Sequence, residues 1–194
     1  MTASPVSQPI KAFASAKSWE RWLAKNGTRS RGIWLRLFKK GSGMASVSYD
    51  EALEGALCHG WIDGQLKKYD EISWLRKFTP RRARSVWSKR NRKRVEHLAS
   101  EGRLGVAGRR EVEAAQKDGR WKAAYDSPKE MTAPRDFLRA LAKNKRAMDF
   151  FKSLNRANVY ALAWRLQTAR RADTRATRIR RFVAMLARGE KLHP

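Results

Sequence analysis

The chain has 194 residues, 42% of them hydrophobic and eight of them tryptophan, which excludes a disordered chain because this content can bury a core. Lysine and arginine number 44 against 18 acidic residues, a formal net charge of +26. Residues 1–71 carry 11 cations and 7 acids, and residues 72–194 carry 33 and 11. A coding bias toward arginine would not explain this uncompensated charge, which predicts a polyanionic partner: nucleic acid, an anionic membrane surface or acidic protein.

The cysteine content and the hydropathy pattern restrict the class of protein further. Cys58 is the only cysteine, which excludes an internal disulfide and a multi-cysteine metal site. The N-terminal stretch lacks the pattern of a secretory signal, and no window holds 18 consecutive apolar residues. We therefore expect a soluble cytoplasmic protein without a transmembrane segment.

The first elements in chain order are a helix and a strand. Residues 1–12 predict a flexible lead-in. Trp19, Trp22 and Leu23 are spaced as one face of a helix. Residues 33–38 alternate between aliphatic side chains and the side chains of Trp, Arg and Phe, a pattern typical of a strand with two different faces.

A second helix and a hairpin follow. Ser48 and Glu51 have the spacing of a capping box and predict a helix that ends at Gly60. Two β-prone runs, residues 61–70 and 71–79, then predict an antiparallel hairpin. With the earlier strand, they would form a small sheet.

From Pro80 onward the pattern predicts helices throughout. The expected helices span residues 86–101, 105–118, 135–142, 145–154, 155–170 and 174–188. The polar, turn-rich stretch 119–134 predicts a linker between an α+β domain over 13–118 and a helical domain over 135–194. The predicted fold class is α+β, with a small antiparallel β-sheet and helices in the N-terminal part and a mainly helical C-terminal part.

Residues 78–94 hold eight cations and no acid. In a helix from Ser85 onward, Trp87 would lie on the docked face, and the cations on the other faces would form like-charge pairs, each costing about 0.2–0.5 kcal/mol. A phosphate at the N-terminus of this helix would relieve that repulsion. The alternative is a solvated helix whose cations pair with acids elsewhere, but with few acids in this part of the chain such pairing cannot be general.

Two further features indicate nucleic acid. Arginines on the polar side of the last helix form a second basic patch, although any surface helix carries charge opposite its apolar stripe. Residues 72, 74, 76 and 78 would share one strand face with alternating aromatic and basic side chains, which would stack bases if exposed or pack in the core if buried. We expect backbone contacts and no base readout. The candidate nucleic-acid-binding residues are Arg76, Lys77, Arg81, Arg82, Arg84, Trp87, Lys89, Arg90, Arg92, Lys93, Arg94, Arg171, Arg175, Arg178 and Arg181.

No catalytic signature is present, and we expect no cofactor or bound metal. Cys58 and His59 are adjacent, which on a helix directs them about 100° apart and favours a core thiol beside a turn histidine. Asp63, between two glycines, favours a turn over an acid poised for chemistry. Whether the protein is an enzyme stays open at this level.

Three segments carry a resemblance to a known family: "EALCHGWIDG", "FTPRRARSVWSKRNRKRVEHLASEGRL" and "RLQTARRADTRATRIRRFVAMLARGEKLHP". They resemble the YdeI/OmpD-associated family, also called bacteriocin-protection proteins, from about Trp19 to His193. In the first of these motifs, relatives usually have Phe at the position of His59. The resemblance implies protection against cationic antimicrobial agents and sometimes an envelope location, but no catalytic residues.

The sequence therefore supports three hypotheses. The first is a non-enzymatic, strongly basic protein that binds DNA or RNA through the phosphate backbone, largely independent of sequence. The second is a stress or antimicrobial-resistance factor of the bacteriocin-protection family, acting at an anionic membrane surface. The third is an enzyme or small-ligand protein that uses a pocket near Trp61, Asp63 and residues 81–84 for an anionic substrate.

Overall fold

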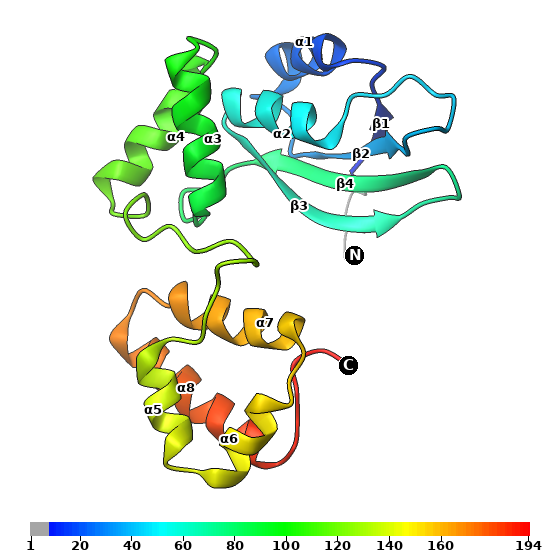
Figure 1. Ribbon diagram of the computed structural model, residues 1–194. Coiled ribbons are helices and arrows are strands. Elements are labelled where there is room, and N and C mark those ends of the chain that lie inside the picture. The colour runs from blue at the N-terminus through cyan, green and yellow to red at the C-terminus, as the bar shows by residue number, and fades with distance from the viewer. Residues whose placement is uncertain (1–7) are drawn as a thin grey trace, which may run out of the picture. The chain divides into compact units, whose positions relative to one another are not determined.

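The computed structural model describes residues 8–194, which divide into two compact units (Figure 1). The first, which we call the sheet unit, comprises the chain up to Ser85 together with Asn91–Trp121. The second, the helical unit, comprises Val86–Arg90 together with Lys122–Pro194. The boundary after Trp121 falls inside the stretch predicted as a linker. The prediction of an α+β protein with a helical C-terminal part is confirmed.

The sheet unit is built on four strands in the order β1-β2-β4-β3. Their bounds are Ile10–Ala12 for β1, Ile33–Phe38 for β2, Trp61–Lys68 for β3 and Ser73–Pro80 for β4. The β3–β4 hairpin and the antiparallel β2–β4 pair agree with the prediction. Strand β1 corrects it: β1 runs parallel to β2, so the sheet is mixed, and residues 10–12 of the segment expected to be a flexible lead-in form a strand. Residues 1–7 of that segment lie outside the described residues.

Four helices belong wholly or mainly to this unit. They are α1 (Ala16–Asn26), α2 (Tyr49–Cys58), α3 (Lys89–Ser100) and α4 (Val106–Lys117). The predicted capping box at the start of α2 is present: the Glu51 amide donates to Ser48 Oγ at 3.3 Å, and the Ser48 amide donates to Glu51 Oε2 at 2.9 Å. Helix α3 begins at Lys89, three residues later than predicted.

The two faces of the sheet differ in whether helices of this unit pack against them. Ile33, Leu35 and Leu37 of β2 are buried on the face against which α1 and α2 lie (Figure 1). Trp19 of α1 and Phe78 of β4 are fully buried in the same core, and the Trp19 indole donates to the Ala52 carbonyl at 2.9 Å. In Figure 1, none of the helices that the structure describes in this unit lies over the opposite face.

Glycine lets α4 approach the end of α2 closely. A Cβ at Gly108 would lie 2.7 Å from the carbonyl oxygens of both Leu57 and Cys58. Gly60, two residues after the end of α2, has a φ of +73°, a left-handed conformation that glycine adopts without steric cost. These two positions hold the end of α2, and with it the start of β3, in place.

The helical unit contains α5 (Arg135–Ala142), α6 (Lys145–Lys152), α7 (Arg156–Gln167) and α8 (Ala172–Ala187). All four were expected, with bounds that differ by no more than three residues. Their core is formed by Phe137, Leu141, Ala147, Leu162, Leu166, Phe182 and Leu186. Asn144 and Asn155 cap α6 and α7 by accepting from Ala147 and Asn158 amides at 3.0 Å.

Candidate nucleic-acid interface

The basic helix α3 has internal counter-charges, contrary to expectation. Arg94 contacts two acids of α2, at 2.8 Å from Asp50 Oδ1 and 3.1 Å from Glu54 Oε1. Arg92 lies 3.6 Å from Glu96 Oε1, and its Nη1 donates to a backbone carbonyl at 2.9 Å. The idea that the cations of this helix are neutralised only from outside is therefore wrong for these two arginines. Acids 40 and 44 residues earlier in the chain reach Arg94, and Glu96 of the same helix reaches Arg92.

The N-terminus of α3 is also occupied by the protein itself. The Lys89 amide donates to the Tyr125 carbonyl at 2.8 Å, and the Lys89 ammonium lies 2.5 Å from Asp126 Oδ1. The Ser85 amide donates to the Arg82 carbonyl at 2.8 Å. Trp87 is only 2% exposed, so its ring offers no face to a base. A phosphate would have to displace these contacts, which removes the reason for placing one there.

Two of the four arginines of the second predicted patch, Arg175 and Arg178, are directed toward α7. Arg175 forms a two-point pair with Asp136, at 2.7 and 2.9 Å, and donates to the Leu166 carbonyl at 2.5 Å. Arg178 donates to the Arg165 carbonyl. Both arginines of α8 thus satisfy carbonyl groups at the C-terminal end of α7, where cations are favourable. They hold two helices together, which is a structural role.

The strand face expected to alternate aromatic and basic side chains is the covered one. Arg76 bonds to Asp63, with Nε at 2.9 Å from Oδ2, and the Tyr49 hydroxyl donates to the same oxygen at 2.7 Å. Burial, followed by the hydrogen bond to Asp63, raises the pKa of Tyr49 to about 12. Phe78 is fully buried. Asp63 lies in strand β3, so the prediction that it fixes a turn is wrong.

Several of the candidate cations are exposed at the surface, but Arg81 is buried. Arg81 is 7% exposed. The exposed candidates are Lys89, Arg90 and Lys93 of α3, Arg82 and Arg84 in the loop after β4, Arg171 directly before α8 and Arg181 within α8. Arg171 lies 3.8 Å from Asp173. Lys77 of β4 is half-buried and points to the opposite face of the sheet from Arg76, because successive strand residues alternate.

That opposite face gathers aromatic rings and cations from three strands. We call it the open sheet face and define it by Trp34, Arg36 and Phe38 of β2, Lys67 of β3 and Lys77 of β4. Lys77 pairs in register with Trp34, and Leu75 lies between Arg36 and Lys67. The Lys67 and Lys77 ammonium groups lie 4.7 and 5.7 Å from the centre of the Trp34 ring. Among the described residues, no ion pair is recorded for either lysine.

Arg36 occupies the other half of the face. Its guanidinium carbon lies 4.5 Å from the centre of the Phe38 ring and 5.0 Å from that of Tyr69, which is 46% exposed. Asp70 Oδ2 accepts from Arg36 Nη2 at 2.7 Å. A hydrogen bond from Ser73, with a smaller contribution from Arg36, holds the pKa of the Asp70 carboxyl below its ordinary value. The carboxylate fixes Arg36 between two aromatic rings.

A cavity of about 350 Å³ adjoins this face beside Lys77. Its lining residues are Gly64, Gln65, Lys77, Thr79, Pro80, Arg82 and Ser85. Amide, hydroxyl, ammonium and guanidinium groups therefore converge on one depression, without an acid among them. This composition suits a phosphate group, since all of these side chains can donate hydrogen bonds to an anion.

The aromatic members of the open sheet face escaped the sequence analysis. The alternation over 33–38 indicates two different faces of the strand, but the highest density of positive charge lies in the residues that follow β4. The sequence pattern that could have identified this face is the alternation in β2. Aliphatic residues occupy one face of the strand, so Trp34, Arg36 and Phe38 must lie on the other. Lys67 and Tyr69 had no signal of their own, because only the hairpin register brings them beside β2.

The hypothesis of a catalytic site gains no support. Cys58 is buried, as expected, and burial raises the pKa of its thiol to about 11. His59 ends α2 and lines a cavity of about 350 Å³ with Trp61, Arg81 and Glu111, among others. Burial lowers the pKa of His59. Asp63, the expected centre of a substrate pocket, is committed to Arg76 and Tyr49.

Comparison with known families divides the chain in the same way as its fold. Residues 11–111 match a family described as a domain of unknown function (DUF8412), and the chain belongs to this family. Residues 130–189 match the family described as Bacteriocin-protection, YdeI or OmpD-Associated, which confirms the resemblance for the helical unit. No curated protein and no solved structure matches the chain. No helix within residues 8–194 is long and apolar enough to cross a membrane.

Proposed function

We propose that this protein binds single-stranded nucleic acid, largely independent of sequence, through the open sheet face and the loop that follows β4. The observation that carries the proposal is the Trp34 ring, which lies under two lysines on the sheet face that the described helices of the sheet unit leave uncovered. Aromatic rings on a basic surface are the usual means of sequence-tolerant single-strand binding, because every base has a face to stack.

The lysines over the ring are compatible with stacking. A lysine side chain is flexible, and its ammonium over an indole is held by an attraction of only about 0.5–1 kcal/mol at an exposed site. A phosphate offers Lys67 and Lys77 a full counter-charge. On binding, the two ammonium groups move from the ring to the backbone, and the ring becomes available to a base.

The loop after β4 extends the surface. Arg82 and Arg84 are exposed, and no ion pair is recorded for their side chains among the described residues. With Lys67 and Lys77, they make four cations available for phosphate contact. This replaces helix α3 as the main source of positive charge, because Arg92 and Arg94 of α3 are already paired with Glu96 and with the acids of α2, respectively.

Fluorescence anisotropy with labelled oligothymidylate tests the proposal. Four phosphate contacts give a salt slope of about −2.8 for single strands, which corresponds to a loss of about fiftyfold in affinity between 50 and 200 mM salt. A duplex of equal length should bind more weakly, since its bases are already stacked. Absence of binding at 50 mM salt, or a preference for duplex, would remove the proposal.

An anionic membrane surface is the second candidate, and the β3–β4 hairpin favours it. Leu66, Tyr69 and Ile72 are 59%, 46% and 43% exposed, beside Lys67 and Lys68. Exposed apolar and aromatic side chains among lysines can anchor a protein at a charged interface. The family description, bacteriocin protection, is also compatible with action at an envelope surface. Sedimentation with anionic and neutral vesicles tests this candidate: binding to the anionic vesicles alone, lost in Leu66→Gln, supports it.

A further inference from the structure

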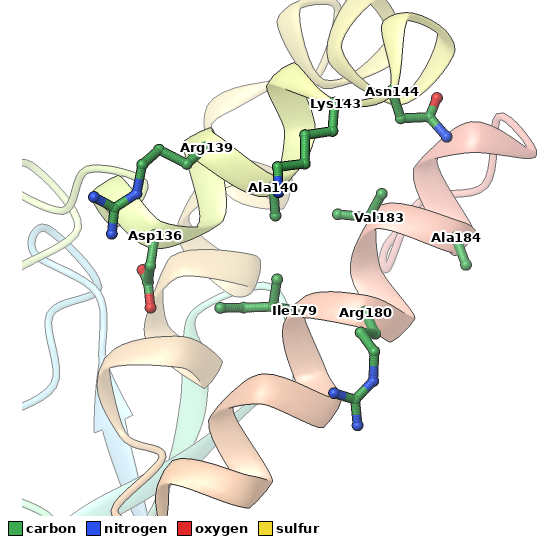
Figure 2. Close-up of a pocket in the computed structure, with 9 residues that line it drawn as sticks. All are labelled: Asp136, Arg139, Ala140, Lys143, Asn144, Ile179, Arg180, Val183 and Ala184. Atoms are coloured by element: carbon green, nitrogen blue, oxygen red, sulfur yellow. The ribbon is translucent and has the colours of Figure 1, made fainter.

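Helices α5 and α8 of the helical unit enclose a groove that the nucleic-acid proposal does not use (Figure 2). Its volume is about 590 Å³, within the usual range of small-molecule sites. The groove is lined by Asp136, Arg139, Ala140, Lys143, Asn144, Ile179, Arg180, Val183 and Ala184. All of these lie in the segment that matches the bacteriocin-protection family.

The floor of the groove is apolar. Figure 2 shows Ile179 and Val183 projecting from α8 into the space between the two helices. Ala140 and Ala184 are too small to fill that space. Four apolar side chains cannot supply the roughly 800 Å² per partner that a stable protein interface buries. The floor is sufficient for an unbranched alkyl chain.

The rim carries positive charge without a free acid. Arg139 and Lys143 are exposed, and within the described residues neither has a recorded ion pair. Arg180 also lines the groove, but Figure 2 shows its side chain directed away from α5. Asp136 is the only acid in the lining, and its carboxylate is held by Arg175 at 2.7 and 2.9 Å. The Arg175 hydrogen bond keeps the pKa of Asp136 low, so this carboxyl stays ionised and paired.

We propose that this groove binds a medium-chain alkyl carboxylate. The alkyl chain lies along Ile179 and Val183, and the carboxylate pairs with Arg139 and Lys143 at the rim. The two parts of the ligand match the two parts of the site: the tail removes apolar surface from water, and the head meets cations that lack a counter-charge. This site is independent of the open sheet face.

Isothermal titration with butyrate, hexanoate, octanoate and decanoate, each below its micellar concentration, tests the proposal. The full chain is used. Removal of apolar surface from water predicts a gain of roughly fourfold in affinity for each methylene until the groove is filled. Decyltrimethylammonium, with the same tail and the opposite charge, should not bind. Affinity that does not depend on chain length would show charge attraction only and overturn the proposal.

Two matched charge variants locate the site. Arg139→Gln with Lys143→Gln should weaken decanoate binding by about tenfold or more, since two charge-assisted contacts are lost. Lys152→Gln with Lys191→Gln removes the same charge from exposed positions outside the groove and should leave the affinity unchanged. Ala140→Leu, which occupies the floor, should weaken binding without a change in charge. Equal losses in the two double variants, or full binding by Ala140→Leu, would contradict the assignment.

Discussion

Replacement of Trp34 by alanine separates base stacking from charge on the open sheet face. The variant removes the ring under Lys67 and Lys77 but no cation. A base stacked on an aromatic side chain contributes about 1–3 kcal/mol, so the dissociation constant for oligothymidylate should rise by roughly 5- to 150-fold. The salt slope should stay the same, because the number of phosphate contacts is unchanged.

Two further variants control this experiment. Trp34→Phe keeps an aromatic face and should retain most of the affinity. Trp74→Ala removes an aromatic ring from the other face of the sheet, where it lies 6.0 Å from the Tyr49 ring, and should leave binding unchanged. Anisotropy at fixed salt gives the affinities, and a thermal melt shows that each variant is folded. A Trp34→Ala affinity within twofold of the parent would refute the stacking argument.

Three other variants test the structure itself. Arg94→Gln should destabilise the protein by about 1 kcal/mol, because its two acidic partners lose their cation. It should weaken oligothymidylate binding less than Lys77→Gln does. A larger loss of binding in Arg94→Gln would indicate that α3 forms the interface. Gly108→Ala should cost roughly 1–3 kcal/mol in a denaturant melt, since a Cβ there meets two carbonyl oxygens at 2.7 Å; a neutral effect would show that α4 can move. Asp136 has a lowered pKa, so its contribution is present above the ordinary aspartate pKa and lost as the pH falls through the lowered value. The loss of melting temperature caused by Asp136→Asn should therefore be full at pH 7 and become smaller as the pH falls below the ordinary aspartate pKa. A loss that does not change with pH would exclude the ion pair with Arg175 as the cause.

Local signals in the sequence were sufficient for most elements of the fold. The capping box of Ser48 and Glu51 fixes the start of α2, and the apolar stripe of Ile179, Phe182, Val183 and Leu186 fixes the core side of α8. These patterns depend on neighbours within one or two turns. Strand β1 has only three residues and depends on its pairing with β2, so no local pattern identifies it.

The candidate site was harder to predict, because its chemistry depends on contacts between distant residues. Arg94 meets acids 40 and 44 residues earlier in the chain, and Arg175 meets an acid 39 residues earlier. The numbers of cations and acids in the sequence do not show which cations form ion pairs with the few acids. Likewise, alternation shows that β4 has two faces, but only the packing of α1 and α2 shows that Arg76 points to the covered one and Lys77 to the other.

Photochemical cross-linking of oligothymidylate, followed by mass spectrometry of the peptides, tests the central claim most directly. The claim is that the nucleic acid lies on the open sheet face. We predict cross-links in the peptides that contain Trp34 and Tyr69, with protection of Lys67 and Lys77 from acylation in the complex. Cross-links confined to α3 or α8, with Lys67 and Lys77 equally reactive in the free and bound protein, would contradict it.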